Sequence, residues 1–349
     1  MTSNFRKREH ATTAALIIGL AAIYYAVGNV GLLQHVGAGP TRLLWPPTGV
    51  SLAALLIFGT RVLPGVALGS FLVNLVGLGR SPLVAVATAL AMTLGMWCGY
   101  QLLRRAGFRL ELDRMKDLAA LVVCGALAAT IISTTIAIGV QVLAGLEQPG
   151  NFWARLLLSW ISSAMGVLVV TPFLLVLRRV HMPRDLRPLR VLEATAMLAG
   201  TVVVMLVATR TTTELLFLVF PFLIWAALRF QLAGAATAML AVSTMAVIGA
   251  VNGSGPFEGQ DVYSNLITIQ AFDGSTALTA LVLAVTTTER NLAHNDVEQA
   301  ASQLASVVSQ LDRSLRPRSV PLARNFTEHS GGEHRVVRER IEGSGAGPA

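Results

Sequence analysis

Long uncharged stretches follow one another along most of the chain, and they predict membrane-spanning helices. A helix needs ~20 apolar residues to cross ~30 Å of hydrocarbon, and fewer where neighbouring helices shelter it. Ten stretches fit this requirement: 11–41, 43–60, 62–79, 81–103, 118–146, 156–177, 194–209, 215–228, 230–257 and 262–288, the last broken by Asp273. We therefore expect an all-α fold, a polytopic transmembrane helix bundle of about ten spans.

The second and third stretches are short and contain prolines, in the sequence LLWPPTGVSLAALLIFGTRVLPGVALGSFLVNL (residues 43–75). Pro46 and Pro64 suit the first turn of a helix, where a missing N–H had no partner. Arg61 then falls in a tight turn between two spans, and small residues after it permit close helix packing. The pattern predicts a short helical hairpin.

The apolar pattern changes after residue 288, so we expect an integral membrane domain over 1–288 and a different structure beyond it. Val297, Leu304 and Leu311 repeat every seven residues, which predicts a cytoplasmic amphipathic helix or short coiled coil over 289–315. Residues 297–315 could then join two copies in a homodimer, but a solvated helix that continues the last span fits equally well. Residues 316–349 mix Pro, Gly, Ser and charges, which predicts a disordered tail.

Composition and charge agree with a membrane location. The chain of 349 residues is 54% hydrophobic and 13% charged, too few charges for a soluble surface of this size. Ten spans that start in the cytoplasm leave four basic residues outside, Arg42, Arg80, Arg155 and Arg210, while the internal loops hold fifteen: Arg6, Lys7, Arg8, Arg61, Arg104, Arg105, Arg109, Arg114, Lys116, Arg178, Arg179, Arg184, Arg187, Arg190 and Arg229. This bias predicts a multi-pass membrane protein with both termini cytoplasmic. It also explains the net charge of +8 without a nucleic-acid partner.

Motifs of catalysis are missing from the sequence. It contains no HExxH, CxxC, GxSxG or Walker-type glycine loop, and Cys98 and Cys124 lie inside predicted spans. We therefore expect no enzyme activity, no catalytic residue, no metal and no cofactor.

Asp273 is the strongest candidate for a functional residue, because a charge inside a span is costly to insert. Arg42, Arg80 and Arg155 are its candidate partners on the outer side. Gly274 follows Asp273, so a structural role at a local helix break is an equal alternative. The remaining candidates for ligand binding or signalling are Trp45 and Asn74, residue types that more often anchor a helix at the interface or join helices by hydrogen bonds.

The stretch at 43–75 resembles the first hairpin of the MASE1 family, bacterial integral-membrane sensory domains that usually precede a histidine kinase or diguanylate cyclase. FWARLLLSWISSAMGVLVVTPFLLVL (152–177) resembles the second characteristic block of that family. FPFLIWAALRFQLAGAA (220–236) and GPF (255–257) resemble the third. The resemblance implies a sensory membrane domain over about residues 11–290, located in the bacterial cytoplasmic (inner) membrane.

Two features depart from the family pattern. Ser162 and Ser163 stand where MASE1 blocks carry a Gly-Asp pair, and Met92 and Gly95 stand where the blocks carry Asn and Glu, so the ligand specificity is open to change. No kinase or GGDEF sequence follows in residues 289–349. We therefore expect a sensor or signal-input protein that detects a small ligand or membrane state and acts on a separate histidine kinase, diguanylate cyclase or permease. The alternative is a small-solute transporter or its accessory subunit.

Overall fold

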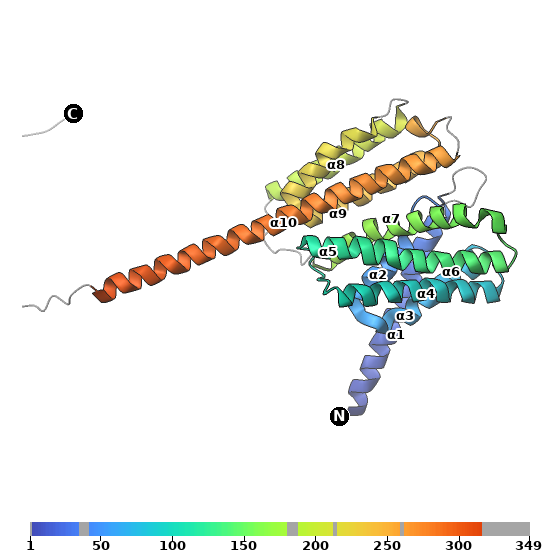
Figure 1. Ribbon diagram of the computed structural model, residues 1–349, viewed down its shortest axis with the longest axis horizontal. Helices are drawn as coiled ribbons and strands as arrows, with labels where there is room; N and C mark the ends of the chain where they lie inside the picture. The colour runs from blue at the N-terminus through green and yellow to red at the C-terminus, as the bar shows by residue number, and fades with distance from the viewer. Residues whose placement is uncertain (1, 35–41, 180–187, 212–214, 259–261, 316–349) are drawn as a thin grey trace, which may run out of the picture. The chain divides into compact units, whose positions relative to one another are not determined.

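The computed structural model describes residues 2–34, 42–179, 188–211, 215–258 and 262–315, and these residues form helices and connecting turns without a strand (Figure 1). The helices are α1 (Thr2–Leu32), α2 (Pro46–Phe58), α3 (Leu63–Leu72), α4 (Pro82–Arg105), α5 (Met115–Ala120), α6 (Ala129–Leu143), α7 (Phe152–Arg179), α8 (Pro188–Arg210), α9 (Phe220–Val251) and α10 (Val262–Leu315). A wider π-helical turn, Val73–Gly77, extends α3, and another, Leu121–Ala128, joins α5 to α6. The all-α prediction is confirmed, and the predicted tail lies outside the described residues.

Eight helical stretches are long and apolar enough to cross a membrane. They are His10–Leu32, Pro46–Gly77, Pro82–Arg105, Met115–Leu143, Pro149–Arg179, Pro188–Arg210, Leu216–Val251 and Asn265–Leu311. Two of the eight, the second and the seventh, contain a reversal of the chain. Each of these two therefore consists of two antiparallel segments, and the resulting ten apolar segments are roughly consistent with the predicted number of about ten.

The first reversal lies between α2 and α3, in the turn Gly59–Val62. A Cβ placed on Gly31 would lie 2.9 Å from the Trp45 ring, and one on Gly77 would lie 2.9 Å from Leu32 Cδ1. The start of α2 and the end of α3 therefore both lie beside the C-terminal end of α1. The chain turns back between them, as the predicted hairpin requires.

The second reversal lies within α9, where the backbone at Gln231 leaves the helical region with φ 53° and ψ −140°. A Cβ placed on Gly234 would lie 2.6 Å from Ala226 O. Eight residues of straight helix would separate these positions by about 12 Å. The chain therefore folds back at Gln231, two residues after Arg229.

Alternating crossings gather the helix ends at two faces, and one of them is basic. Salt bridges of 2.7 Å join Arg179 to Glu111 and Arg229 to Glu193 on this face. The described arginines at the helix ends and turns of this face are Arg61, Arg104, Arg105, Arg178, Arg179, Arg190 and Arg229. We call it the basic face.

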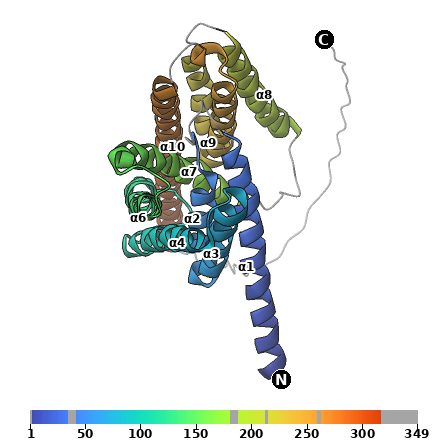
Figure 2. The ribbon, with the colours of Figure 1, turned by 90° about the vertical axis from the view of Figure 1, so that its right-hand side faces the viewer.

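Helix α2 contacts both α1 and α7 (Figure 2), and the backbone of α2 lies directly against the backbone of α7. Gly49 and Gly166 face each other there, so the two backbones approach without an intervening side chain. Thr48 Oγ1 donates to Ser163 O at 2.8 Å and Trp45 N donates to Ser162 O at 3.1 Å. These bonds fix the start of α2, and Trp45 just before it, on the middle of α7.

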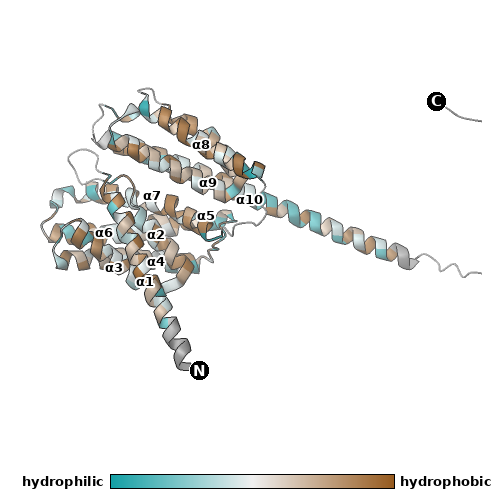
Figure 3. Ribbon diagram, turned by 180° about the vertical axis from the view of Figure 1, so that it is seen from behind, coloured by the Kyte–Doolittle hydropathy of each residue, from teal (hydrophilic) through white to brown (hydrophobic). Residues whose placement is uncertain are grey.

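Helix α10 continues past its apolar part without a break to Leu315. Figure 3 shows its apolar residues giving way to a mostly polar stretch. In that stretch Val297 and Leu304 are each 67% exposed. The helix predicted for 289–315 is thus the continuation of α10, and its role as a dimer seam stays a prediction.

Candidate ligand-binding cavity

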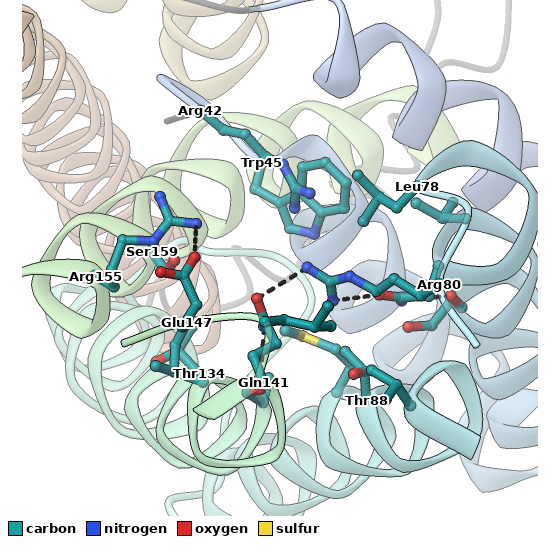
Figure 4. A pocket seen from close by; sticks show the side chains of 18 of the residues that line it. Arg42, Trp45, Leu78, Arg80, Thr88, Thr134, Gln141, Glu147, Arg155 and Ser159 are labelled. Carbon is teal, nitrogen blue, oxygen red and sulfur yellow. Dashed lines mark hydrogen bonds and ion pairs between the residues drawn. The ribbon is translucent and has the colours of Figure 1, made fainter. Parts of the chain in front are cut away.

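A cavity of about 700 Å³ lies at the face opposite the basic face, where several helix ends meet (Figure 4). Its walls come from α1, from the segment Arg42–Trp45, from the end of α3, from the start of α4, from the end of α6 and from the start of α7. Proline starts α2 and α4 at this level, so the helices begin here without an unpaired N–H at that position. Loop side chains can therefore point into the space between the helix ends.

Arg80 crosses the cavity and is held by two neutral amide side chains. Its Nη1 donates to Asn74 Oδ1 and its Nη2 donates to Gln141 Oε1, each at 2.9 Å. Asn74 in turn donates through Nδ2 to Ser70 O at 2.8 Å, which fixes its orientation. Burial lowers the pKa of Arg80, and the nearby Arg155 lowers it further. The two amides position the guanidinium without neutralising its charge.

Arg42 lies on the Trp45 ring, with its Cζ 4.1 Å from the ring centroid. This is the geometry of a cation–π contact. Burial, followed by repulsion from Arg80, lowers the pKa of Arg42 to about 10, so the guanidinium is still charged at neutral pH. The ring holds Arg42 in place but supplies no formal negative charge.

Arg155 forms a salt bridge with Glu147, with Nη2 and Oε1 2.8 Å apart. Both side chains are largely buried, at 17% and 16% exposed. Glu147 is the one acidic side chain among the described residues of the cavity wall, which also carries three arginines. The wall therefore has a net charge of about +2.

Two buried hydroxyl groups also face the cavity. Thr88 is 3% exposed and Ser162 is 2% exposed, and both line the cavity. Neither hydroxyl oxygen has a hydrogen-bond partner among the described residues. Both oxygens are buried from water, so a bound molecule reaches them only after a local rearrangement of the wall.

Four of the five predicted site residues lie together at this cavity: Arg42, Trp45, Asn74 and Arg155. Sequence reasoning named Arg80 only as a partner for a carboxylate, and it missed Thr88, Gln141 and Glu147. The arginines themselves could have indicated the site, because the predicted outer side of the bundle carries few basic residues and three of them lie at this cavity.

Asp273 lies elsewhere, in the contact between α10 and α9. It is 2% exposed, and its Oδ2 accepts a hydrogen bond from Ser243 Oγ at 2.8 Å. The structure thus gives Asp273 a serine as its partner, and none of the described salt bridges joins it to Arg42, Arg80 or Arg155.

The residues that depart from the expected family pattern also fall at or near the cavity. Met92, Ser162 and Ser163 line it. Gly95 lies where α4 packs against α6, directly against Ser133. A small residue there permits the close approach of two helices whose ends form the cavity wall.

One segment connects the cavity to α10. Leu44 N donates to Gln34 Oε1 at 3.0 Å, which ties the segment Arg42–Trp45 to the end of α1. Gln270 Nε2, on α10, donates to Leu43 O. The residue next to Arg42 is therefore bonded directly to the helix that leaves the membrane domain.

Comparison with known proteins identifies the family of the chain. No curated protein and no solved structure matches it. The sequence profile of MASE1 matches residues 13–291, which is most of the chain and includes the whole cavity. The protein therefore belongs to the MASE1 family of membrane-associated sensory domains.

Proposed function

We propose that this multi-pass membrane protein is a signal-input protein in which a small ligand binds in the cavity and the signal leaves through α10 to a separate protein. It acts by contact rather than by catalysis. Membership of a sensory family supports the role. The observation that carries the proposal is the hydrogen bond from Gln270 to Leu43 O, because it joins the cavity wall to the helix that continues to Leu315.

Transmission through a helix requires that the helix have two arrangements that the ligand distinguishes. The segment Arg42–Trp45 is bonded to α10 at Leu43 and to α7 at Trp45. A ligand that draws Arg42 inward therefore pulls on both helices. A shift of α10 of 1–2 Å, typical of helix movements in switching proteins, would carry the change to its exposed part.

The distribution of basic residues supports an orientation for this signal. The basic face is proposed to meet the cytoplasm of the inner membrane, with both termini on that side. The cavity then opens toward the outside, and the exposed apolar side chains Val297, Leu304 and Leu311 offer a cytoplasmic docking surface. A histidine kinase, diguanylate cyclase or permease is the proposed class of partner.

The test is site-specific photo-crosslinking in native membranes. A benzophenone side chain at Val297 or Leu304 should capture one protein, and the neighbouring polar positions Ser302 and Gln303 serve as placement controls. Gln270→Leu should change the capture yield, because it removes the bond to Leu43 O. Thr244→Val is the matched control, because that exposed hydroxyl bonds only to Leu240 O in its own helix.

Two results contradict the proposal. The first is equal capture in the parent and in Gln270→Leu, or no capture from any position. The second is movement of a solute across vesicles by the purified protein alone, which supports the transporter alternative.

A further inference from the structure

We infer that the cavity binds a small organic anion with two carboxylate or phosphate groups, and that Arg42, Arg80 and Arg155 hold those groups. The inference deepens the proposed function, because it names the class of ligand that the cavity senses. It rests on the charge, geometry and size of the cavity and on the place of its arginines in the membrane.

Charge is the first argument. The cavity wall carries three arginines against one glutamate, and Arg80 and Arg42 are held by neutral groups, namely two amides and an indole ring. Three guanidinium groups around one space repel one another, so a bound anion would stabilise their arrangement. A ligand with two negative charges would remove the excess.

Geometry is the second argument. Guanidinium groups bind carboxylates and phosphates through paired N–H donors in a fixed fork. Asn74 and Gln141 fix Arg80, Trp45 fixes Arg42, and Glu147 fixes Arg155. The donors are thus oriented before a ligand arrives, which reduces the entropy lost on binding.

The place of these arginines in the membrane is the third argument. Arginine is depleted on the side of a bundle that is translocated across the membrane. The predicted outer side has four, and three of them line the cavity although they are 38 and 75 residues apart along the chain: Arg42, Arg80 and Arg155. Three of the few arginines on the predicted outer side thus lie at one site, which indicates that their charge is used there.

Size and apolar surface indicate an organic ligand rather than a bare inorganic ion. A cavity of about 700 Å³ is in the range of small-molecule sites. Trp45, Leu78 and Leu158 line it, so a carbon skeleton has apolar surface to contact.

An anionic lipid headgroup has the same chemistry as a soluble anion, so the experiment separates the two sources. Protein in nanodiscs of phosphatidylcholine is titrated with succinate, malate and 3-phosphoglycerate, each of which carries two anionic groups, and with inorganic phosphate for comparison. Binding is followed by calorimetry and by thermal stability. A parallel set of nanodiscs contains phosphatidylglycerol. We expect saturable binding of at least one organic dianion in phosphatidylcholine, tighter than that of inorganic phosphate and undiminished by phosphatidylglycerol.

Variants test the assignment of residues. Arg80→Gln should lower the affinity for the dianion by about tenfold or more, because it removes charge-assisted hydrogen bonds. Arg80→Lys keeps the charge but loses the paired N–H donors, so its affinity for the dianion should lie between those of the parent and of Arg80→Gln. Glu147→Gln should tighten binding, which a purely structural role for Glu147 would not produce. Arg210→Gln is the matched control, because Arg210 is exposed, lies on the predicted outer side and does not line the cavity.

The inference is overturned by three results: no saturable binding of any of these anions, equal affinity in the parent and in Arg80→Gln, or occupancy by phosphatidylglycerol that excludes the soluble anions. Its failure is distinct from failure of the proposed function. If Arg80→Gln loses anion binding but Gln270→Leu leaves the photo-crosslinking yield unchanged, the anion site is kept and the signalling path is rejected. If Gln270→Leu changes the photo-crosslinking yield but no anion binds, the signalling path is kept and the anion site is rejected.

Discussion

The contact between Gly49 and Gly166 allows a quantitative test of how the cavity is held together. A Cβ on Gly166 would lie 2.6 Å from Thr48 Oγ1 and closer still to Trp45 O. Ordinary carbon contacts begin at about 3.5 Å. Because backbone atoms stand in the way, no rotation of a side chain relieves the clash, and Gly166→Ala must push α2 away from α7.

The magnitude follows from two losses and one gain. Overpacking costs about 1–3 kcal/mol. Separation also stretches the bonds from Trp45 N to Ser162 O and from Thr48 Oγ1 to Ser163 O, each worth about 1 kcal/mol. Alanine returns up to about 1 kcal/mol of helix propensity. We expect a net loss of about 2–4 kcal/mol in the free energy of unfolding.

The assay is reversible unfolding in mixed micelles, with Gly139→Ala as the control. Gly139 lies within α6 and has nothing within 4 Å of its Cβ position, so alanine there should leave stability unchanged or raise it by up to about 1 kcal/mol. Equal stability of the two variants would refute the close contact of α2 with α7. The displaced Trp45 should also weaken anion binding in Gly166→Ala.

Two further predictions concern the buried carboxylate and the topology. Asp273→Asn keeps the shape of the side chain and removes an ionisable group that costs about 3 kcal/mol to insert. The variant should insert normally yet change the yield of photo-crosslinking from the probes at Val297 and Leu304. An unchanged yield would reduce Asp273 to a structural residue that accepts a hydrogen bond from Ser243. Alkaline phosphatase fused after residue 258 should be active and after residue 300 inactive, because the basic face should be cytoplasmic, and the opposite activities would reject the orientation.

The crossings were predictable from sequence because lipid forces each buried backbone into helices, so uncharged length alone predicts a span. Both chain reversals were predictable for a related reason. Each carries one arginine, Arg61 or Arg229, which cannot stay in the hydrocarbon and so marks the interface. The broken helical backbone at Gln231 confirms that a single charge is enough to reveal such a turn.

The site was less predictable because it depends on which helix ends are neighbours. Arg42, Arg80 and Arg155 were candidate partners for Asp273, but its hydrogen-bond partner in the structure is Ser243 of α9. Arg80 and Gln141 are 61 residues apart and meet only because α4 packs on α6. Periodicity assigns residues to spans, but it does not assign spans to neighbours.

The arginines of the cavity differ in how a ligand could use them for signalling. Arg80 is held by Asn74 and Gln141, so its contact with an anion would be the same in both arrangements of the bundle. Arg42 precedes Leu43, which is bonded to α10, so its contact would change as α10 moves. A ligand shifts an equilibrium only by its difference in affinity for the two states. Arg80→Gln should therefore weaken binding yet preserve the response at saturation, whereas Arg42→Gln should lose the response itself.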